Sequence, residues 1–168
     1  MSLDAPAHRE DAAVTLRPIG DGDQPFLVAL YASTREQELA AVPWDAAQKA
    51  AFLRMQFDAQ HAHYQEHFAG ASFDIIVVNG QPAGRLYVAR GADEIRIVDI
   101  ALLPEYCNRG IGTRLLRQLQ SEARAAGTAV RIHVERFNPA LRLYERLGFR
   151  EIEDKGVYLF LESLKSDV

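Results

Sequence analysis

The sequence predicts an α+β domain. Segments in which every second residue is apolar, as in a half-buried strand, are interspersed with longer segments whose apolar residues recur every three or four positions, as in a helix. The dipeptide Asn79-Gly80, a strong hairpin-turn signal, separates two of the strand-like segments. In order, the predicted elements are one strand, two helices, three strands, a helix, a strand, a helix and two strands.

The first three elements follow from spacing and end signals. Alternation predicts a strand at 14–18, and the aspartates within 21–23 mark a turn. Apolar residues at helical spacing predict a first helix over 26–39. Asp45 can cap a second helix, which we expect to run to Gly70.

Three strands follow, at 73–78, 83–89 and 94–102. In the third strand the apolar residues change from odd positions, up to Ile97, to even positions from Val98 onward. One inserted residue at this point would restore a single apolar face, so we predict a β-bulge near Ile97 or Val98. Such a bulge would bend the strand away from a neighbour and free backbone groups for a ligand.

The second half of the chain begins with a helix from Ile111 that ends at Gly127, roughly four to five turns at 3.6 residues per turn. A strand at 130–134 comes next. Pro139 at the first helical position and Gly148 just past the last predict a short helix. The closing strands are predicted at 149–153 and 157–162, with the turn at Lys155-Gly156.

One domain accounts for the 168 residues: we assign 14–165 to it, 1–13 to a mobile N-terminus and 166–168 to a tail. The net charge of −4 gives no general attraction to nucleic acid or to an anionic membrane surface. No stretch approaches the ~20 apolar residues that span a bilayer. A single cysteine and an N-terminus without an apolar signal region favour a cytoplasmic protein.

The loop between the predicted strand at 94–102 and the predicted helix from Ile111 carries the strongest functional signal. Gly110 and Gly112 lie at the start of the helix, although glycine costs ~1 kcal/mol against alanine in a helix. Without Cβ atoms, the unpaired N–H groups of the first turn can hold a phosphate or pyrophosphate closely. A loop that needs glycine only for its turn is the alternative. A dinucleotide fingerprint is excluded because Leu115 stands at its third glycine position, and a Walker-type ending is absent.

The segment from Pro104 to Leu116 resembles the acyl-coenzyme A loop of the GNAT N-acetyltransferases, whose usual pattern is Gln/Arg-x-x-Gly-x-Gly/Ala. The second half of that family's pattern follows from Asn138 to Phe149. One departure is Cys107, which stands where the family has Gln or Arg. The resemblance implies a GNAT-like mixed, mostly antiparallel sheet of about seven strands, with helices on both faces and coenzyme A between splayed strands.

The resemblance also implies roles for individual residues. Backbone groups of Ile100, Ala101 and Leu102 would hold the pantetheine arm of acetyl-coenzyme A and polarise its thioester. Tyr144 would return a proton to the thiolate, since its phenol has a reference pKa of ~10. The remaining contacts to the coenzyme would come from the loop and the start of the last helix: Cys107, Asn108, Arg109, Gly110, Ile111, Gly112, Thr113 and Asn138. Asn138 can equally be explained as a helix cap.

The general base is left open. Asp99 is the weak candidate because it interrupts an apolar strand beside the predicted bulge, although it can instead be solvated or paired with a cation such as Arg96. Glu94, His133 and Glu135 are alternatives on the polar faces of the central strands, as is a base acting through water.

Histidine and cysteine suggest two further sites. His63 and His67 are one helical turn apart and His61 is close by, but no carboxylate or cysteine completes a metal site, so no metal is expected. The histidines, together with Trp44, Phe57 and Tyr64, would edge an acceptor pocket or simply pack. At a helix N-terminus the thiolate of Cys107 would be favoured and reactive; a buried, inert thiol is the alternative.

These observations predict an enzyme that moves the acetyl group of acetyl-coenzyme A to a primary amine by direct transfer in a ternary complex. A non-catalytic module that binds or senses acyl-coenzyme A is the alternative. The acceptor, a small molecule or a peptide, is not identified by the sequence; Glu36, Glu38 and Asp45 would suit a cationic amine or be plain solvated charges. A homodimer is left open.

Overall fold

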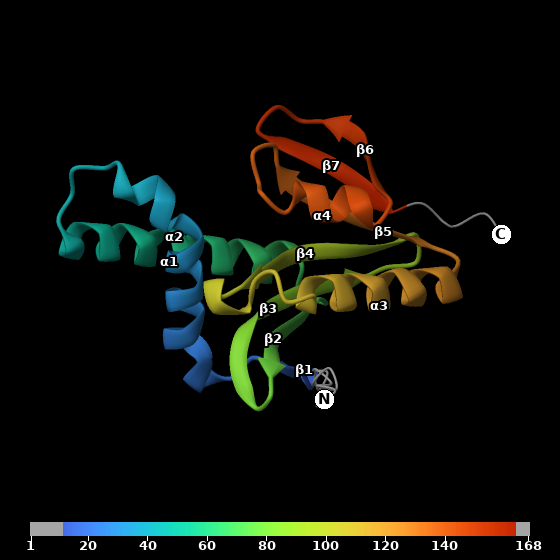
Figure 1. Ribbon diagram of the computed structural model, residues 1–168, viewed down its shortest axis with the longest axis horizontal. Coiled ribbons are helices and arrows are strands. Elements are labelled where there is room, and N and C mark those ends of the chain that lie inside the picture. Colours follow the sequence, from blue (N-terminus) through green and yellow to red (C-terminus); the bar gives the residue numbers. More distant parts are fainter. Residues whose placement is uncertain (1–11, 164–168) are drawn as a thin grey trace, which may run out of the picture.

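One seven-stranded sheet runs through the computed structural model, which describes residues 12–163 (Figure 1). The strands, in chain order, are β1 (Val14–Pro18), β2 (Ser72–Val78), β3 (Gln81–Arg90), β4 (Glu94–Leu102), β5 (Ala129–Glu135), β6 (Phe149–Asp154) and β7 (Tyr158–Ser163). Their order across the sheet is β1-β2-β3-β4-β5-β7-β6. Neighbours are antiparallel except β4 and β5, which are parallel. The predicted α+β class and mixed, mostly antiparallel sheet are confirmed.

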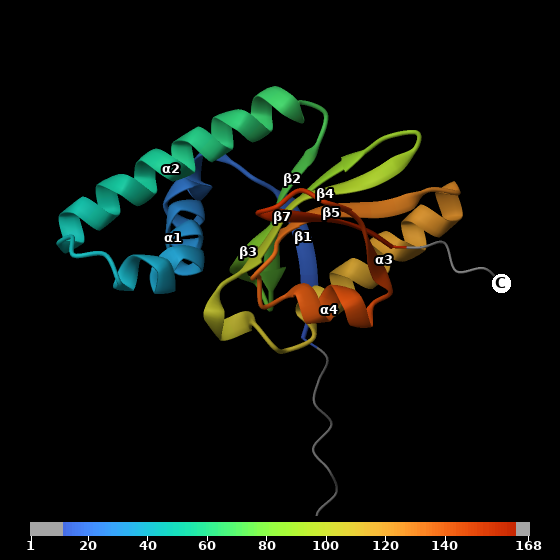
Figure 2. The same ribbon diagram turned by 90° about the horizontal axis from the view of Figure 1, so that it is seen from above.

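Helices cover both faces of the sheet (Figure 2). They are α1 (Gln24–Ala40), α2 (Ala46–His67), α3 (Ile111–Ala126) and α4 (Leu141–Arg146), with single 3-10 turns η1 (Asp21–Asp23) and η2 (Pro104–Tyr106). Adjacent residues of β2 separate the two layers: Ile75 packs with α1 and α2, whereas Ile76 packs in the larger core under α3 and α4. Within the described residues, no helix has the length and apolar composition required to cross a bilayer.

Most predicted boundaries agree with the structure to within a few residues. Asp45 caps α2 through a hydrogen bond from the Gln48 amide, and Gly127 ends α3 in a left-handed conformation with φ of 70°. The predicted start of the last helix is wrong. Asn138 Oδ1 accepts a hydrogen bond from the Ala140 amide at 2.9 Å and holds a separate turn, so the helix begins at Leu141 rather than at Pro139.

Most of the predicted mobile N-terminus (1–13), the last two residues of the predicted domain (14–165) and the predicted tail (166–168) lie outside the described residues, which exclude 1–11 and 164–168. At the N-terminal side, Ala13 donates its amide to Asn79 Oδ1 at 2.9 Å and accepts from the Asn79 amide at 2.9 Å. Ala13 is therefore hydrogen-bonded to the hairpin between β2 and β3.

The predicted β-bulge is present at Val98. Tyr87 of β3 pairs with Asp99, but the next residue, Val88, pairs with Ile97, which leaves Val98 as the extra residue. As a result Ile97 and Ile100 both join the core beneath α3, and Asp99 points to the opposite face. The change of parity in the sequence is thus the signature of a real insertion in the strand.

The two central strands part beyond the bulge. β4 pairs with β5 from Glu94 opposite Ala129 to Ile97 opposite Ile132, and the pairing ends there. Farther on, β4 continues to pair with β3 and β5 with β7. The downstream ends of β4 and β5 therefore border an opening in the middle of the sheet, and the chain passes directly from one of them into η2 and α3.

Candidate functional site

The N-terminus of α3 presents unpaired backbone donors to solvent. Gly110 is its N-cap, with φ of 80° and ψ of 4°, a conformation that strongly favours glycine. No side chain caps the helix there, and the preceding residues from Cys107 to Gly110 are exposed. The first-turn N–H groups and the positive end of the helix dipole are thus available to an anion.

Neither packing nor backbone conformation within the protein requires glycine at position 112. It lies inside the helix with no positive φ, and an added Cβ would meet only Leu143 Cδ2, at an ordinary contact distance of 3.6 Å. Alanine would fit this position and would favour the helix by ~1 kcal/mol. A ligand that approaches the backbone closely at this point does explain glycine, and the donor set suits a phosphate group.

Cys107 does not have the environment expected of a reactive thiolate. It ends η2, four positions before the first residue of α3, and its thiol donates to the carbonyl of Leu103 at 3.5 Å. Partial burial, and then the charge of Glu105, raise the pKa of the thiol above its ordinary value. The raised pKa disfavours an activated thiolate, and the reactivity of Cys107 stays a prediction.

The end of β4 forms one wall of the opening. Gly84 of β3 allows β4 to lie unusually close, since an added Cβ would be 2.1 Å from the Ala101 carbonyl oxygen. In an antiparallel pair, alternate residues direct their N–H and C=O groups away from the partner strand. Because β5 has already parted, such groups between Ile100 and Leu102 face the opening rather than a strand.

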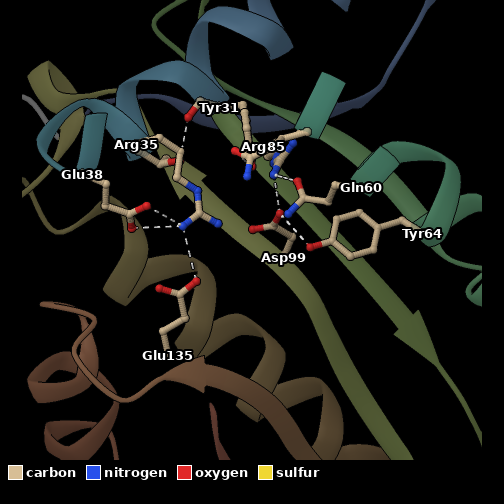
Figure 3. A network of polar contacts seen from close by, with 10 residues as sticks. Tyr31, Arg35, Glu38, Gln60, Tyr64, Arg85, Asp99 and Glu135 are labelled. Atoms are coloured by element: carbon tan, nitrogen blue, oxygen red, sulfur yellow. Dashed lines mark hydrogen bonds and ion pairs between the residues drawn. The ribbon is translucent and has the colours of Figure 1, made fainter. Parts of the chain in front are cut away.

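Asp99 is held in a buried polar network on the α2 side of β4 (Figure 3). Arg85 of β3, only 4% exposed, forms an ion pair with Asp99 and donates to Gln60 Oε1 at 2.8 Å. Tyr64 of α2 donates its hydroxyl to Asp99 Oδ2 at 3.3 Å. Burial and the nearby Asp99 raise the pKa of Tyr64, so this phenol stays protonated.

The ion-pair partner of Asp99 is Arg85 and not Arg96, which the sequence had suggested. Arg96 instead donates to Glu94 at 2.8 Å. Desolvation alone would lower the pKa of Arg85, but Asp99 and two neighbouring tyrosines raise it above its ordinary value. The guanidinium is therefore permanently charged and compensates the Asp99 carboxylate.

Removal of Arg85 should destabilise the protein strongly. We expect Arg85→Met to lower the free energy of unfolding by about 3 kcal/mol, because an unpaired carboxylate would be left in a largely buried place. Denaturant unfolding followed by circular dichroism measures this loss. Arg54→Met, which removes an exposed pair with Asp58 at 3.2 Å, is the matched control and should cost less than about 1 kcal/mol. Equal losses in the two variants would contradict a buried, compensating role.

Tyr144 is buried, with 4% exposure, in the core under α3 and α4. Its ring meets Phe149 edge-on at a centroid distance of 5.6 Å. Burial raises the pKa of the phenol, and the charge of Asp99 raises it further. The two predicted catalytic residues, one from α4 and one from β4, thus lie within electrostatic range of each other, and the phenol stays protonated at neutral pH.

The other candidate bases are engaged elsewhere. Glu94 lies between Arg96, at 2.8 Å, and Arg131, at 3.3 Å. His133 stacks on Phe160 with centroids 4.4 Å apart, and desolvation and neighbouring cations lower the pKa of its imidazole. Glu135, at the end of β5, pairs with Arg35 of α1 at 3.5 Å.

Some of the aromatic and histidine residues of α2 pack against other side chains, and one of them lies at the site. Tyr64 reaches Asp99, whereas Phe57 is buried in the core and stacks on His61 at 5.7 Å. The rings of His63 and His67 stack at 4.1 Å. Among residues 12–163, no three His, Cys, Asp or Glu side chains are grouped as metal ligands. Trp44 contacts Phe52 at 5.1 Å and is 40% exposed.

Sequence reasoning missed Arg85 and Gln60 as members of the site. Arg85 is the charged residue in the middle of the otherwise apolar strand β3, a signal that was available in the sequence. Gln60 lies within the predicted second helix, and only the folded chain brings it to Arg85.

The chain is similar to known acetyltransferases in sequence and in overall fold. A family model described as an acetyltransferase (GNAT) domain matches residues 65–151. The chain is 31% identical over 84 residues to the ribosomal protein bS18-alanine N-acetyltransferase of Haemophilus influenzae, an alignment that spans 49% of this chain and 58% of that protein.

Solved structures share the fold over most of their length. The paiA N-acetyltransferase of Thermoplasma acidophilum, in complex with coenzyme A, superposes with a TM-score of 0.66 at 17% identity, covering 90% of this chain and 98% of that one. The ribosomal-protein-S18-alanine N-acetyltransferase of Escherichia coli superposes with a TM-score of 0.55 at 23% identity, covering 93% and 96%. The region matched by the family model runs from the end of α2 into β6 and contains the glycine loop, the parted strands and Tyr144. The chain belongs to the GNAT acetyltransferase family.

Proposed function

We propose that the protein transfers the acetyl group of acetyl-coenzyme A to a primary amine. The observation that carries this proposal is Gly112, whose missing side chain leaves the backbone of α3 open where neither packing nor φ requires it. The pyrophosphate of the coenzyme would bind there, to the N–H groups between Cys107 and Thr113. The pantetheine arm would then follow the end of β4 into the opening between β4 and β5.

The chemistry is direct transfer. The neutral amine attacks the thioester carbonyl carbon and forms a C–N bond. A backbone N–H of β4 between Ile100 and Leu102 stabilises the resulting oxyanion. The C–S bond then breaks and releases the thiolate of coenzyme A. Tyr144 donates its proton to the departing thiolate, a role for which a buried, protonated phenol is suited. The proton of the amine leaves through Asp99, directly or by way of water, with Arg85 and Tyr64 fixing the orientation of the carboxylate.

The acceptor would enter from the α1 and α2 side of the sheet, where Asp99 and Tyr64 lie. A small amine and a peptide amine are both compatible with this route. The relative from Haemophilus influenzae acts on an alanine of a ribosomal protein, which supports a peptide amine as one class to include in a screen.

Turnover with a panel of amines tests this function. Purified protein, acetyl-coenzyme A and each amine should give acetylated amine, detected by mass spectrometry, and calorimetry should detect coenzyme A binding. Binding without acetylation of any amine would favour the alternative, a sensing module. Absence of coenzyme A binding would contradict the proposal as a whole.

A further inference from the structure

An ion pair crosses the acceptor side of the opening and does not belong to the chemistry described above. Arg35, near the end of α1, contacts Glu135 Oε1 at 3.5 Å, at the end of β5 (Figure 3). Glu135 alternates with the inward-facing residues Val134 and Ile132 of β5, so its side chain lies on the same face of the sheet as Asp99. The pair therefore joins α1 to the strand that borders the opening.

Arg35 is shared between two carboxylates. It also contacts Glu38, one helical turn farther along α1, at 3.1 Å. Its Nε atom is buried without a hydrogen-bond partner among the described residues. A buried donor without a partner is unfavourable, so the guanidinium of Arg35 is not fully satisfied in this position. Because Glu38 lies on the same helix, Arg35 can leave Glu135 and keep a partner.

Departure of Arg35 would leave Glu135 without compensation. The carboxylates at this place are Glu38, Glu135 and Asp99, whereas the guanidinium groups are Arg35 and Arg85. Since Arg85 is committed to Asp99, a free Glu135, whose side chain is 40% exposed, would be open to a cation from outside the protein.

We propose that Glu135 binds a positively charged group of the acceptor, which displaces Arg35, and that the acceptor is therefore an amine with a second positive charge. This inference rests on the proposed function for the identity of the site. Glu135 selects the class of acceptor, and Arg35 competes with the acceptor for the Glu135 carboxylate.

Three amines of equal chain length provide the probe. Butylamine, 1,4-diaminobutane and 4-aminobutanoate each have four carbons, and their far ends are a neutral methyl, a positive ammonium and a negative carboxylate. Calorimetry with the coenzyme A-bound protein should show that the diamine binds more tightly than butylamine by about three- to fivefold, the range of a half-exposed ion pair. The aminobutanoate should bind most weakly.

Two variants separate the partners. Glu135→Gln should abolish the preference for the diamine, and Arg35→Gln should tighten diamine binding because the competitor is gone. The double variant should behave like Glu135→Gln alone. Arg54→Gln, from an exposed pair on α2, is the control and should change nothing.

The outcomes distinguish this inference from the function on which it rests. Diamine binding that depends on Glu135, without acetylation, would support the inference and contradict catalysis. Acetylation with no preference among the three amines, or with a preference for aminobutanoate that Arg35→Gln removes, would overturn the inference and leave the acetyltransferase intact. In turnover assays the Glu135→Gln effect should appear in KM and leave kcat nearly unchanged.

Discussion

Tyr144→Phe should reduce kcat by about a hundredfold or more, the usual contribution of a positioned general acid. The phenol is buried and protonated, and its oxygen is the atom that this substitution removes. The ring and its edge-on contact with Phe149 remain, so unfolding and coenzyme A binding should change little. Steady-state kinetics at saturating acetyl-coenzyme A measure the effect, with calorimetry as the test of intact binding.

Packing must be separated from proton donation in this experiment. Phe149→Leu disturbs the same contact without removing the hydroxyl; it should cost up to about 1.5 kcal/mol of stability and leave kcat nearly unchanged. The pKa of Tyr144 is raised above its reference value of ~10, so Tyr144 itself should cause no loss of rate between pH 7 and about pH 10. An unchanged kcat in the Phe variant with intact binding would make Tyr144 a packing residue.

Gly112→Ala should change stability and coenzyme binding in opposite directions. The free energy of unfolding should rise by up to ~1 kcal/mol, since alanine favours the helix and its Cβ meets only an ordinary contact. Coenzyme A binding should weaken by about tenfold or more, because the methyl group occupies the approach to the first-turn N–H groups. Denaturant unfolding and calorimetry on the same preparation measure the two effects.

A truncated donor identifies which part of the coenzyme is affected. S-acetylpantetheine lacks the diphosphate, so its use as a donor should be nearly the same in the Gly112→Ala variant and in the natural protein. Gly22→Ala, at a position where an added Cβ meets no atom within 4 Å, is the control far from α3 and should leave both measurements unchanged. Loss of binding to both donors alike would mean that the loop, and not the diphosphate contact, has been disturbed.

The sequence predicted features that depend on residues near one another in the chain. Periodicity located the helices and strands, the Asp45 cap was correct, and the parity change in β4 placed the bulge to within one residue. The start of the last helix was missed because the Asn138 side chain can serve either a helix or a turn, and propensity does not decide between them.

The remaining features depend on contacts between distant residues. Arg85 and Asp99 are 14 residues apart, and Gln60 lies 25 residues before Arg85; only the packing of α2 on β3 and β4 joins them. Arg35 and Glu135 are linked by α1 and β5, whose relative position no local pattern specifies. Charged residues in a sequence show that partners are needed, but the fold decides which partners are within reach.

The extra residue at Val98 also affects how relatives should be aligned with this chain. A relative without the insertion would need a one-residue gap at this point in β4; a gap placed a few residues away would match Asp99 with a side chain from the opposite face. Matching residues in this strand by identity alone would then equate a core position with an acceptor-facing one. The role of a residue in this strand should therefore be assigned from a relative only when the pairing with β3 is used to align the two chains.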